Sequence, residues 1–343
     1  MTATNVLLTC AGMRGDMVAA FQAALGREGE GGVVVAADSS RLAPTLYLAD
    51  RSALVPRVLD PDYVEALLAL CEQHAIRAVL PLTDLDQSIL TSRREDFAAL
   101  GAIVVASDPE ACELCADKWA AHCFFEERGI GSPQTWLQGD LPPVEEMPFP
   151  VLVKARRGFA ARHIYRAHDP DELAFFLRYT TEQSMVQVFC SGEEFSIDLI
   201  CDLDGRCIEA VPRSMIESKG GETIKGESLG DRALREAAVQ VAEALGIKGP
   251  ACVQCFRDGD RYLVTDVNAR FGGGFPVHVA AGGGYPDIVL ALARGESPEP
   301  RLGAYRPGVV MVRYLAQVIL ERDAAGELRV AADASGLRTP PAV

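Results

Sequence analysis

The chain has 343 residues, 49% of them hydrophobic, which exceeds one typical core and argues against disorder. Its formal net charge of −15 argues against nucleic acid as a partner, because so acidic a chain repels phosphate backbones. No apolar run reaches the roughly 18 residues of a membrane span, the start lacks the features of a signal peptide, and ten cysteines without disulfide-like spacing predict a cytoplasmic protein with reduced thiols.

The N-terminal part alternates short apolar runs with helical patterns. This rhythm predicts a doubly wound parallel sheet of the α/β class. The first turn, CAGMRG, departs from the dinucleotide fingerprint GxGxxG, so no dinucleotide is implied. Strands are expected at 5–9, 32–38, 78–82 and 101–107, and helices at 60–75 and 84–99.

From about residue 118 the pattern changes to that of an α+β module. A helix from residue 118 leads into a proline-rich link at 137–150, and closely spaced strands make up most of the chain beyond this link. Helices are expected at 169–180 and 231–246, and a hairpin over 251–268.

The segment TDVNARFGGGFP, residues 265–276, carries the first chemical signal. Strand alternation aims Asp266 and Asn268 at one face, and their oxygens suit a hard cation such as Mg²⁺ or Mn²⁺. Arg270 adds a fixed positive charge, and the glycines at 272–274 permit a close backbone approach to a ligand. The alternative is a polar strand end that runs into a flexible loop.

Two further segments indicate anion and nucleotide binding. Lys154 ends a strand and precedes a loop, so a cation and backbone N–H groups could both face a phosphate. Gln187 and Glu194 flank a turn at Ser191-Gly192, a spacing that suits an adenine-reading strand edge followed by a ribose-binding carboxylate. Zinc is not expected at the pair Cys252/Cys255, whose side chains would point to opposite faces of a strand.

Taken together, Lys118, Lys154, QVFCSGEEF, Gln254 and DVNAR resemble the ATP-grasp superfamily. The match is to one half of the carbamoyl-phosphate synthetase large subunit and to the stand-alone carboxylate–amine ligases similar to it. The resemblance implies an N-terminal doubly wound parallel sheet, the pre-ATP-grasp domain, followed by a two-lobed ATP-grasp module. The expected divisions are a Rossmann-like domain at 1–112, a small lobe at 113–185, a large lobe at 186–300, and C-terminal strands with a tail at 301–343.

The resemblance also implies how ATP is held. Lys118 and Lys154 would contact the phosphates, with Lys154 also near the adenine. Gln187 would meet the adenine amino group, and Glu194 the ribose. The adenine ring edge would face the backbone of Phe189 and Cys190.

For the metal, Mg²⁺ or Mn²⁺, the resemblance implies the ligands Gln254, Asp266 and Asn268. Arg270 and Arg213 would stabilise charge on the transferred phosphoryl group. Two alternatives stay open: Arg213 could pair with a nearby acid, and Gln254 could be an ordinary amide on the strand surface.

The sequence departs from the family in places. Asp266 stands where relatives more often have glutamate, and Gly158 alone represents a loop that is glycine-rich in relatives. Arg156, Arg157 and Arg162 could substitute charge for the missing backbone contacts. His278 is either a substrate contact or a structural histidine.

These features predict an ATP-dependent ligase that joins a carboxylate to an amine through an acyl phosphate and releases ADP and phosphate. One alternative is phosphorylation of bicarbonate or carbamate, as in carbamoyl-phosphate synthetase. Another is a non-catalytic ATP-binding regulatory protein. The expected partners are small-molecule carboxylate and amine substrates, with neither nucleic acid nor membrane, and the oligomeric state is left open.

A shared metal requires Gln254 and Asp266 to face the same side of their hairpin. A two-residue turn made by Asp258 and Gly259 would place them on opposite faces, because side chains alternate with period two. One extra residue restores the match, so the sequence predicts a bulge at Gly259, which would adopt the left-handed conformation.

Overall fold

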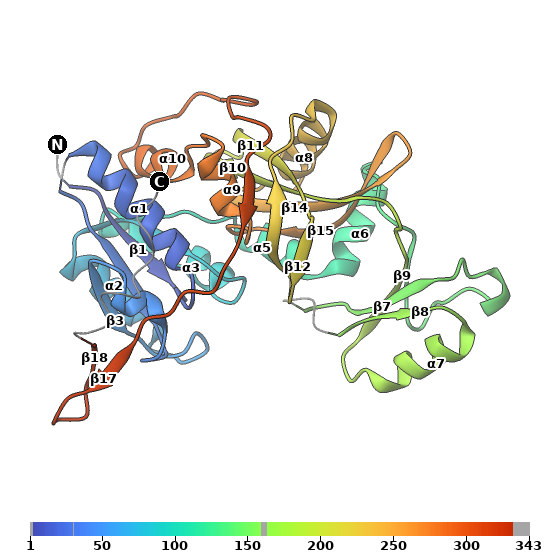
Figure 1. Cartoon of the computed structure of the whole chain (residues 1–343), viewed down its shortest axis with the longest axis horizontal. Coiled ribbons are helices and arrows are strands. Elements are labelled where there is room, and N and C mark those ends of the chain that lie inside the picture. Colours follow the sequence, from blue (N-terminus) through green and yellow to red (C-terminus); the bar gives the residue numbers. More distant parts are fainter. Residues whose placement is uncertain (1–2, 30, 159–162, 332–343) are drawn as a thin grey trace. The chain divides into compact units, whose positions relative to one another are not determined.

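The computed structural model of the chain describes residues 3–29, 31–158 and 163–331, and its contacts divide it into two compact units (Figure 1). Unit 1 comprises residues 1–105, 285–298 and 313–343, and unit 2 comprises residues 106–284 and 299–312.

Unit 1 is built on a five-stranded parallel sheet of order β3-β2-β1-β4-β5, which confirms the predicted doubly wound sheet. The inner strands are apolar and buried, as expected for a parallel sheet covered on both faces. Strand β3 was not predicted, because its sequence RSAL is mostly exposed and shows no apolar pattern. The strands are β1 (Asn5–Thr9), β2 (Val34–Asp38), β3 (Arg51–Leu54), β4 (Ile76–Pro81) and β5 (Ile103–Val104).

Helices pack around this sheet (Figure 1). The single helix predicted over 84–99 is in fact two, because Arg93 has φ −111° and ψ 20° and interrupts the helical conformation. The C-terminal part contributes one helix and a short hairpin to the unit. The elements are α1 (Gly15–Glu28), η1 (Pro44–Tyr47), α2 (Tyr63–Gln73), α3 (Gln87–Ser92), α4 (Arg94–Ala99), α10 (Tyr285–Ala293), β17 (Leu320–Arg322) and β18 (Leu328–Val330).

Unit 2 contains two antiparallel four-stranded sheets. The first has the order β6-β9-β7-β8 and carries Lys154 and Gln187. Helix α7 packs against it, with Leu173 in a core that includes Val151, Val153 and Val186. Its elements are β6 (Thr135–Leu137), β7 (Val151–Ala155), β8 (Ile164–Ala167), α7 (Pro170–Tyr179) and β9 (Ser184–Val188).

The second sheet of unit 2 has the order β11-β10-β14-β15 and one apolar face. Phe195, Ile197 and Leu199 alternate along β10 into a core shared with helices α6 and α8. The opposite face carries the polar residues of the candidate site. The elements are α6 (Lys118–Glu127), β10 (Glu194–Cys201), β11 (Cys207–Ser214), α8 (Arg232–Ala244), β14 (Gly249–Asp258) and β15 (Arg261–Asn268).

The two units are divided differently from the domains proposed from the sequence. Residues 106–112 group with unit 2, where the Ser107 hydroxyl accepts from Lys248 N at 3.0 Å and Asp108 pairs with Lys248 Nζ at 2.7 Å. Helix α10 groups with unit 1. The remaining elements are α5 (Pro109–Ala116), η2 (Val144–Glu146), β12 (Glu217–Lys219), β13 (Glu222–Glu227), α9 (Phe275–Ala280) and β16 (Val310–Val312).

All ten cysteines are free thiols. Within the described ranges, no helix combines the length and apolar character needed to cross a membrane.

Candidate active site

Two cross-strand rows of mostly polar side chains lie on the face of the sheet β11-β10-β14-β15 that is opposite its apolar core. Residues directly opposite in antiparallel strands point to the same side, so the register fixes each row. One row runs Arg213, Ser196, Gln254, Asp266 across the four strands. The next row runs Val211, Asp198, Cys252, Asn268. The predicted metal ligands Gln254, Asp266 and Asn268 therefore do share one face.

The predicted convergence of Gln254 and Asp266 is correct, but the predicted position of the bulge is wrong. Asp258 pairs with Arg261, so the turn has two residues, Gly259 and Asp260. Gly259 has the left-handed conformation expected of it, with φ 60°. The register shifts instead beside Thr265, since Cys255 pairs with Val264 and Gln254 with Asp266. This extra residue in β15 reverses the parity of the side chains and brings Asp266 opposite Gln254.

The three oxygen donors fit a hard cation only in combination with further ligands. Asp266 is the one carboxylate of the set, and Asn268 Oδ1 already accepts from Arg270 NH2 at 3.0 Å. Among the described residues, no group of three or more His, Cys, Asp or Glu is placed to hold a metal. Mg²⁺ commonly takes one or two protein carboxylates together with substrate phosphates. The donor set therefore suits a metal that arrives with a nucleotide.

Lys118 lies beside this row. Its Nζ is 3.3 Å from Asp266 Oδ1 and donates to the Gly158 carbonyl at 3.3 Å. The ammonium side chain is 13% exposed and that of Asp266 23%. Lys118 thus connects the row that contains Gln254 and Asp266 with the loop that follows β7.

Lys154 is buried in the other sheet and is held by Gln187. Its Nζ donates to Gln187 Oε1 at 2.9 Å, and Gln187 Nε2 donates to Thr135 Oγ1 at 2.9 Å. Burial lowers the pKa of Lys154 to about 8; the charge of Asp266 opposes this shift and that of Lys118 adds to it. Gln187, predicted to read the adenine amino group, has a side-chain partner at each end of its amide.

Some of the residues predicted to surround the adenine and ribose already have partners within the protein. Phe189 N donates to Pro150 O at 3.2 Å, so this amide already has a partner, and the Phe189 ring lies 3.8 Å from the Arg166 guanidinium carbon. Cys190 is half-buried. Burial raises the pKa of Glu194 despite the charge of Arg213, which lies on the same face.

Arg213 pairs with a buried acid, which was the alternative to a phosphate contact. Its Nε donates to Asp198 Oδ2 at 2.7 Å, and its NH1 donates to Thr223 Oγ1 at 2.6 Å. Arg213 is 2% exposed and Asp198 1%. Asp198 was not among the predicted site residues, although the alternation Glu194, Ser196, Asp198 along β10 was a usable signal.

The three glycines after β15 are needed because side chains of the same unit lie against their Cα atoms. A Cβ on Gly272 would overlap the Asp198 carboxylate, and one on Gly274 would overlap the Arg213 guanidinium. The close approach expected toward a ligand is therefore an approach to the Asp198–Arg213 pair.

His278 is a structural residue. It is fully buried, and its Nε2 lies 3.0 Å from Glu209 Oε2, which also accepts from Gly284 N at 2.8 Å. Glu209 thus contacts both His278 and Gly284, in the segment that follows the glycines.

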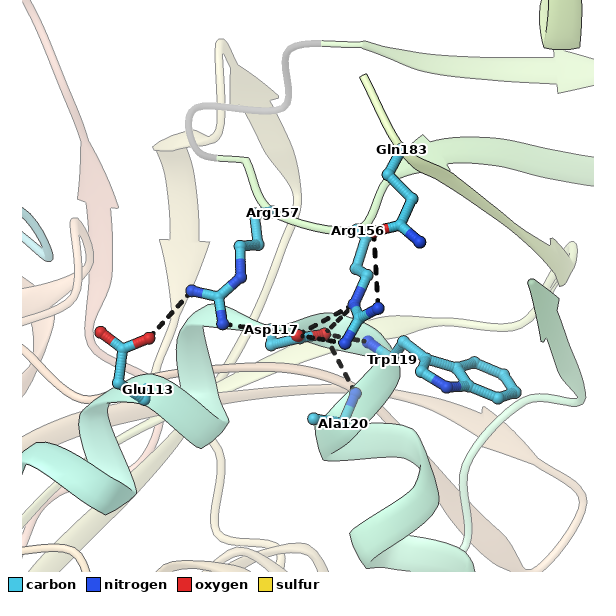
Figure 2. A network of polar contacts seen from close by, with 7 residues as sticks. All are labelled: Glu113, Asp117, Trp119, Ala120, Arg156, Arg157 and Gln183. Carbon is cyan, nitrogen blue, oxygen red and sulfur yellow. Dashed lines mark hydrogen bonds and ion pairs between the residues drawn. The ribbon is translucent and has the colours of Figure 1, made fainter. Parts of the chain in front are cut away.

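Arg156 and Arg157, in the described part of the loop after β7, both pair with carboxylates. Arg156 binds Asp117 and Arg157 binds Glu113 (Figure 2). Arg162 lies outside the described residues.

Two family models match separate parts of the chain. Residues 6–105 match the model described as PylC-like, N-terminal domain. Residues 180–318 match the model described as ATP-grasp in the biosynthetic pathway with Ter operon.

Curated relatives are carbamoyl-phosphate synthases. The enzyme of Methanobrevibacter smithii is 26% identical over 254 residues, which cover 68% of this chain and 66% of that protein. The large chain from Thermoplasma volcanium is 24% identical, and the match covers 62% of this chain but 22% of that protein. The chain thus spans about two thirds of the first relative and about a fifth of the second.

Solved structures share the fold. N5-carboxyaminoimidazole synthetase from Staphylococcus aureus, complexed with ADP, superposes with a TM-score of 0.70 at 14% identity, covering 92% of this chain and 83% of that one. L-amino acid ligase from Bacillus licheniformis superposes with a TM-score of 0.67 at 19% identity, covering 90% and 78%. The predicted resemblance to the ATP-grasp superfamily is therefore confirmed by the match of residues 180–318 to an ATP-grasp model, alongside the match of residues 6–105 to the PylC-like model.

Proposed function

We propose that the protein is an ADP-forming ligase that joins a carboxylate to an amine. The observation that carries this proposal is the pairing of Gln254 with Asp266, with Asn268 in the next row on the same face. Lys118 Nζ lies 3.3 Å from Asp266 Oδ1. Oxygen donors and a cation on one face suit the phosphates of a metal-bound nucleotide. A protein that only senses ATP needs no such phosphoryl-transfer set.

In the proposed reaction, a carboxylate oxygen attacks the γ-phosphorus of ATP, and the bond to the β–γ bridging oxygen breaks, which releases ADP. The amine nitrogen then attacks the acyl carbon, loses its proton, and displaces phosphate. Lys118 and Lys154 would hold the phosphates, Glu194 the ribose, and Arg270 would offset the charge on the transferred group. Mg²⁺ held by Gln254, Asp266 and Asn268 would neutralise phosphate charge.

A screen for ADP release over pairs of carboxylic acids and amines tests the proposal. With the correct acid alone, hydroxylamine should trap a hydroxamate in an ATP-dependent manner, because it attacks an acyl phosphate as an amine does. AMP in place of ADP would exclude the mechanism, since it would indicate adenylation.

A second candidate reaction is phosphorylation of bicarbonate, which the similarity to carbamoyl-phosphate synthases favours. The same screen separates the two candidates: ADP formed with bicarbonate, and with none of the carboxylic acids, would favour this reaction. A cytoplasmic location, for which the free cysteines are suitable, and assembly into a homo-oligomer are further proposals.

ATP binding should take up a proton near pH 8.5. The buried Lys154 has its pKa lowered to about 8, whereas nearby phosphate charge would favour its protonated form. ATP affinity should therefore decrease as pH rises above about 8, with up to about one proton taken up per ATP bound. Calorimetry in buffers of different ionisation enthalpy measures this uptake, and Lys154→Met should abolish it.

The free protein should show the opposite dependence in its stability. Unfolding returns Lys154 to its ordinary pKa of 10.5, so the unfolded chain binds more protons between about pH 8 and 10.5. The contribution of this lysine to the free energy of unfolding should therefore increase with pH across that window.

For the binding prediction, ATP binding in wild-type protein without proton uptake at pH 8.5 would remove Lys154 from the phosphate site.

A further inference from the structure

A buried carboxylate fastens the loop after β7 to the start of helix α6 (Figure 2). Asp117 is 4% exposed, and its Oδ1 caps α6 by accepting from Trp119 N at 3.2 Å and Ala120 N at 3.1 Å. The same carboxylate binds the Arg156 guanidinium, through Nε to Oδ1 at 2.7 Å and NH2 to Oδ2 at 2.7 Å. Such a two-pronged pair fixes orientation as well as distance.

Asp117 is charged at neutral pH. Burial by itself would raise its pKa, but hydrogen bonds from Arg156 and from Ala120 N, together with the arginine charges, lower it below its usual value. Because Asp117 already neutralises Arg156, this arginine contributes position to the loop more than it contributes free charge.

Backbone contacts complete the connection. Lys118 N donates to Arg156 O at 3.0 Å, and Arg156 N donates to Gln183 O at 2.8 Å. Lys118 Nζ reaches the Gly158 carbonyl of the same loop. Lys118 follows Asp117 directly in sequence, and Lys154 precedes Arg156 by two positions. The Asp117–Arg156 pair therefore joins the two chain segments that carry the lysines proposed to hold phosphate.

We propose that Asp117 and Arg156 are positioning residues that set the spacing of Lys118 and Lys154 for the nucleotide phosphates. This inference rests on the proposed ATP-dependent function. Neither residue needs to touch the nucleotide: Asp117 holds the helix start from which Lys118 projects, and Arg156 holds the end of the strand that carries Lys154. Misplacing two cations matters because phosphate binding depends on both reaching the same group.

Asp117→Asn tests the proposed role; it also removes the longer contact of Asp117 Oδ2 with Arg157 NH2, at 3.4 Å. Asparagine caps helices as well as aspartate does, so α6 should still begin at Lys118. The amide nitrogen that replaces one carboxylate oxygen cannot accept from Arg156, so the two-pronged pair is lost. The dissociation constant for Mg·ATP should increase on the order of tenfold, because a buried, charged contact is removed. Binding of adenosine, which has no phosphates, should stay within about twofold.

Arg156→Gln tests the same contact from the other side and leaves the helix cap intact. It should weaken ATP binding as Asp117→Asn does, and the double variant should bind ATP about as well as either single variant, because both substitutions remove the Asp117–Arg156 pair. Glu113→Gln is the matched control: it breaks the exposed ion pair with Arg157 in the same network and should leave ATP binding unchanged.

The outcomes separate the two proposals. Wild-type protein that fails to bind ATP would overturn the proposed function, and this inference with it. ATP binding in wild-type protein with unchanged affinity in both Asp117→Asn and Arg156→Gln would overturn the positioning role alone. Equal losses of ATP and adenosine binding would also overturn it, because they would indicate a general structural defect.

Discussion

Replacing Asp266 with asparagine should reduce turnover on the order of a thousandfold at saturating Mg²⁺ while leaving the fold intact. Asp266 is the one carboxylate among the three proposed metal ligands, and it also pairs with Lys118 at 3.3 Å. Asparagine keeps the shape of the side chain but removes its charge, so neither the metal nor the lysine keeps its anionic partner. The side chain is 23% exposed, so the change in stability should stay within about 0.5 kcal/mol.

Asp260→Asn is the matched control for this experiment. Asp260 lies in the exposed turn of the same hairpin, so the substitution makes the same chemical change away from the row. Mn²⁺ binding in the presence of ADP, followed by electron paramagnetic resonance, adds a readout independent of turnover. An Asp266→Asn variant that binds Mn²⁺·ADP and turns over like wild-type protein would refute the metal assignment.

The hairpin shows how far sequence reasoning reaches at this site. Period-two alternation shows that Gln254 and Asp266 can share a face only if one extra residue is inserted between them. That requirement does not say where the residue goes, and the glycine signal drew the prediction to Gly259. In the structure Gly259 takes the first position of a two-residue turn, and Thr265 is the extra residue. A bulge inside a strand carries no comparable sequence signal.

Contacts between side chains on different helices and strands could not be predicted from the sequence, for a different reason. The sequence identifies Lys154 and Gln187 as chemically suited to a nucleotide. It does not show that these two side chains bind each other across neighbouring strands. The same holds for Arg156, whose charge was considered as a substitute for the missing backbone contacts of the loop and is matched by Asp117. Such pairings depend on how separate elements pack, whereas local alternation depends only on the strand itself.

The fold was more predictable because buried strands and helices repeat their apolar residues at characteristic spacings. The inner strands of the N-terminal sheet are continuous apolar runs and were placed correctly. Strand β3 was not, because an exposed edge strand needs no apolar residues. Pattern therefore identifies the elements that form a core, and misses those held mainly by backbone hydrogen bonds.

Replacing Arg213 alone should destabilise the protein by about 3–5 kcal/mol, because it leaves the Asp198 carboxylate charged, buried and unpaired. Arg213→Met makes this change, and chemical denaturation measures it. The double variant Arg213→Met/Asp198→Leu removes both charges and should regain most of the loss, since apolar side chains can replace a buried ion pair. The pair supports Gly272 and Gly274, so the double variant also tests whether this support requires charge.

The double variant then decides between the two roles considered for Arg213. With Arg213 2% exposed and bound to Asp198 at 2.7 Å, we expect a positioning role, and hence ATP affinity within about twofold of wild type once stability is regained. A folded double variant with normal ATP affinity but a much lower kcat would instead indicate that Arg213 reaches the transferred phosphoryl group, because such a loss marks a contact made only in the transition state.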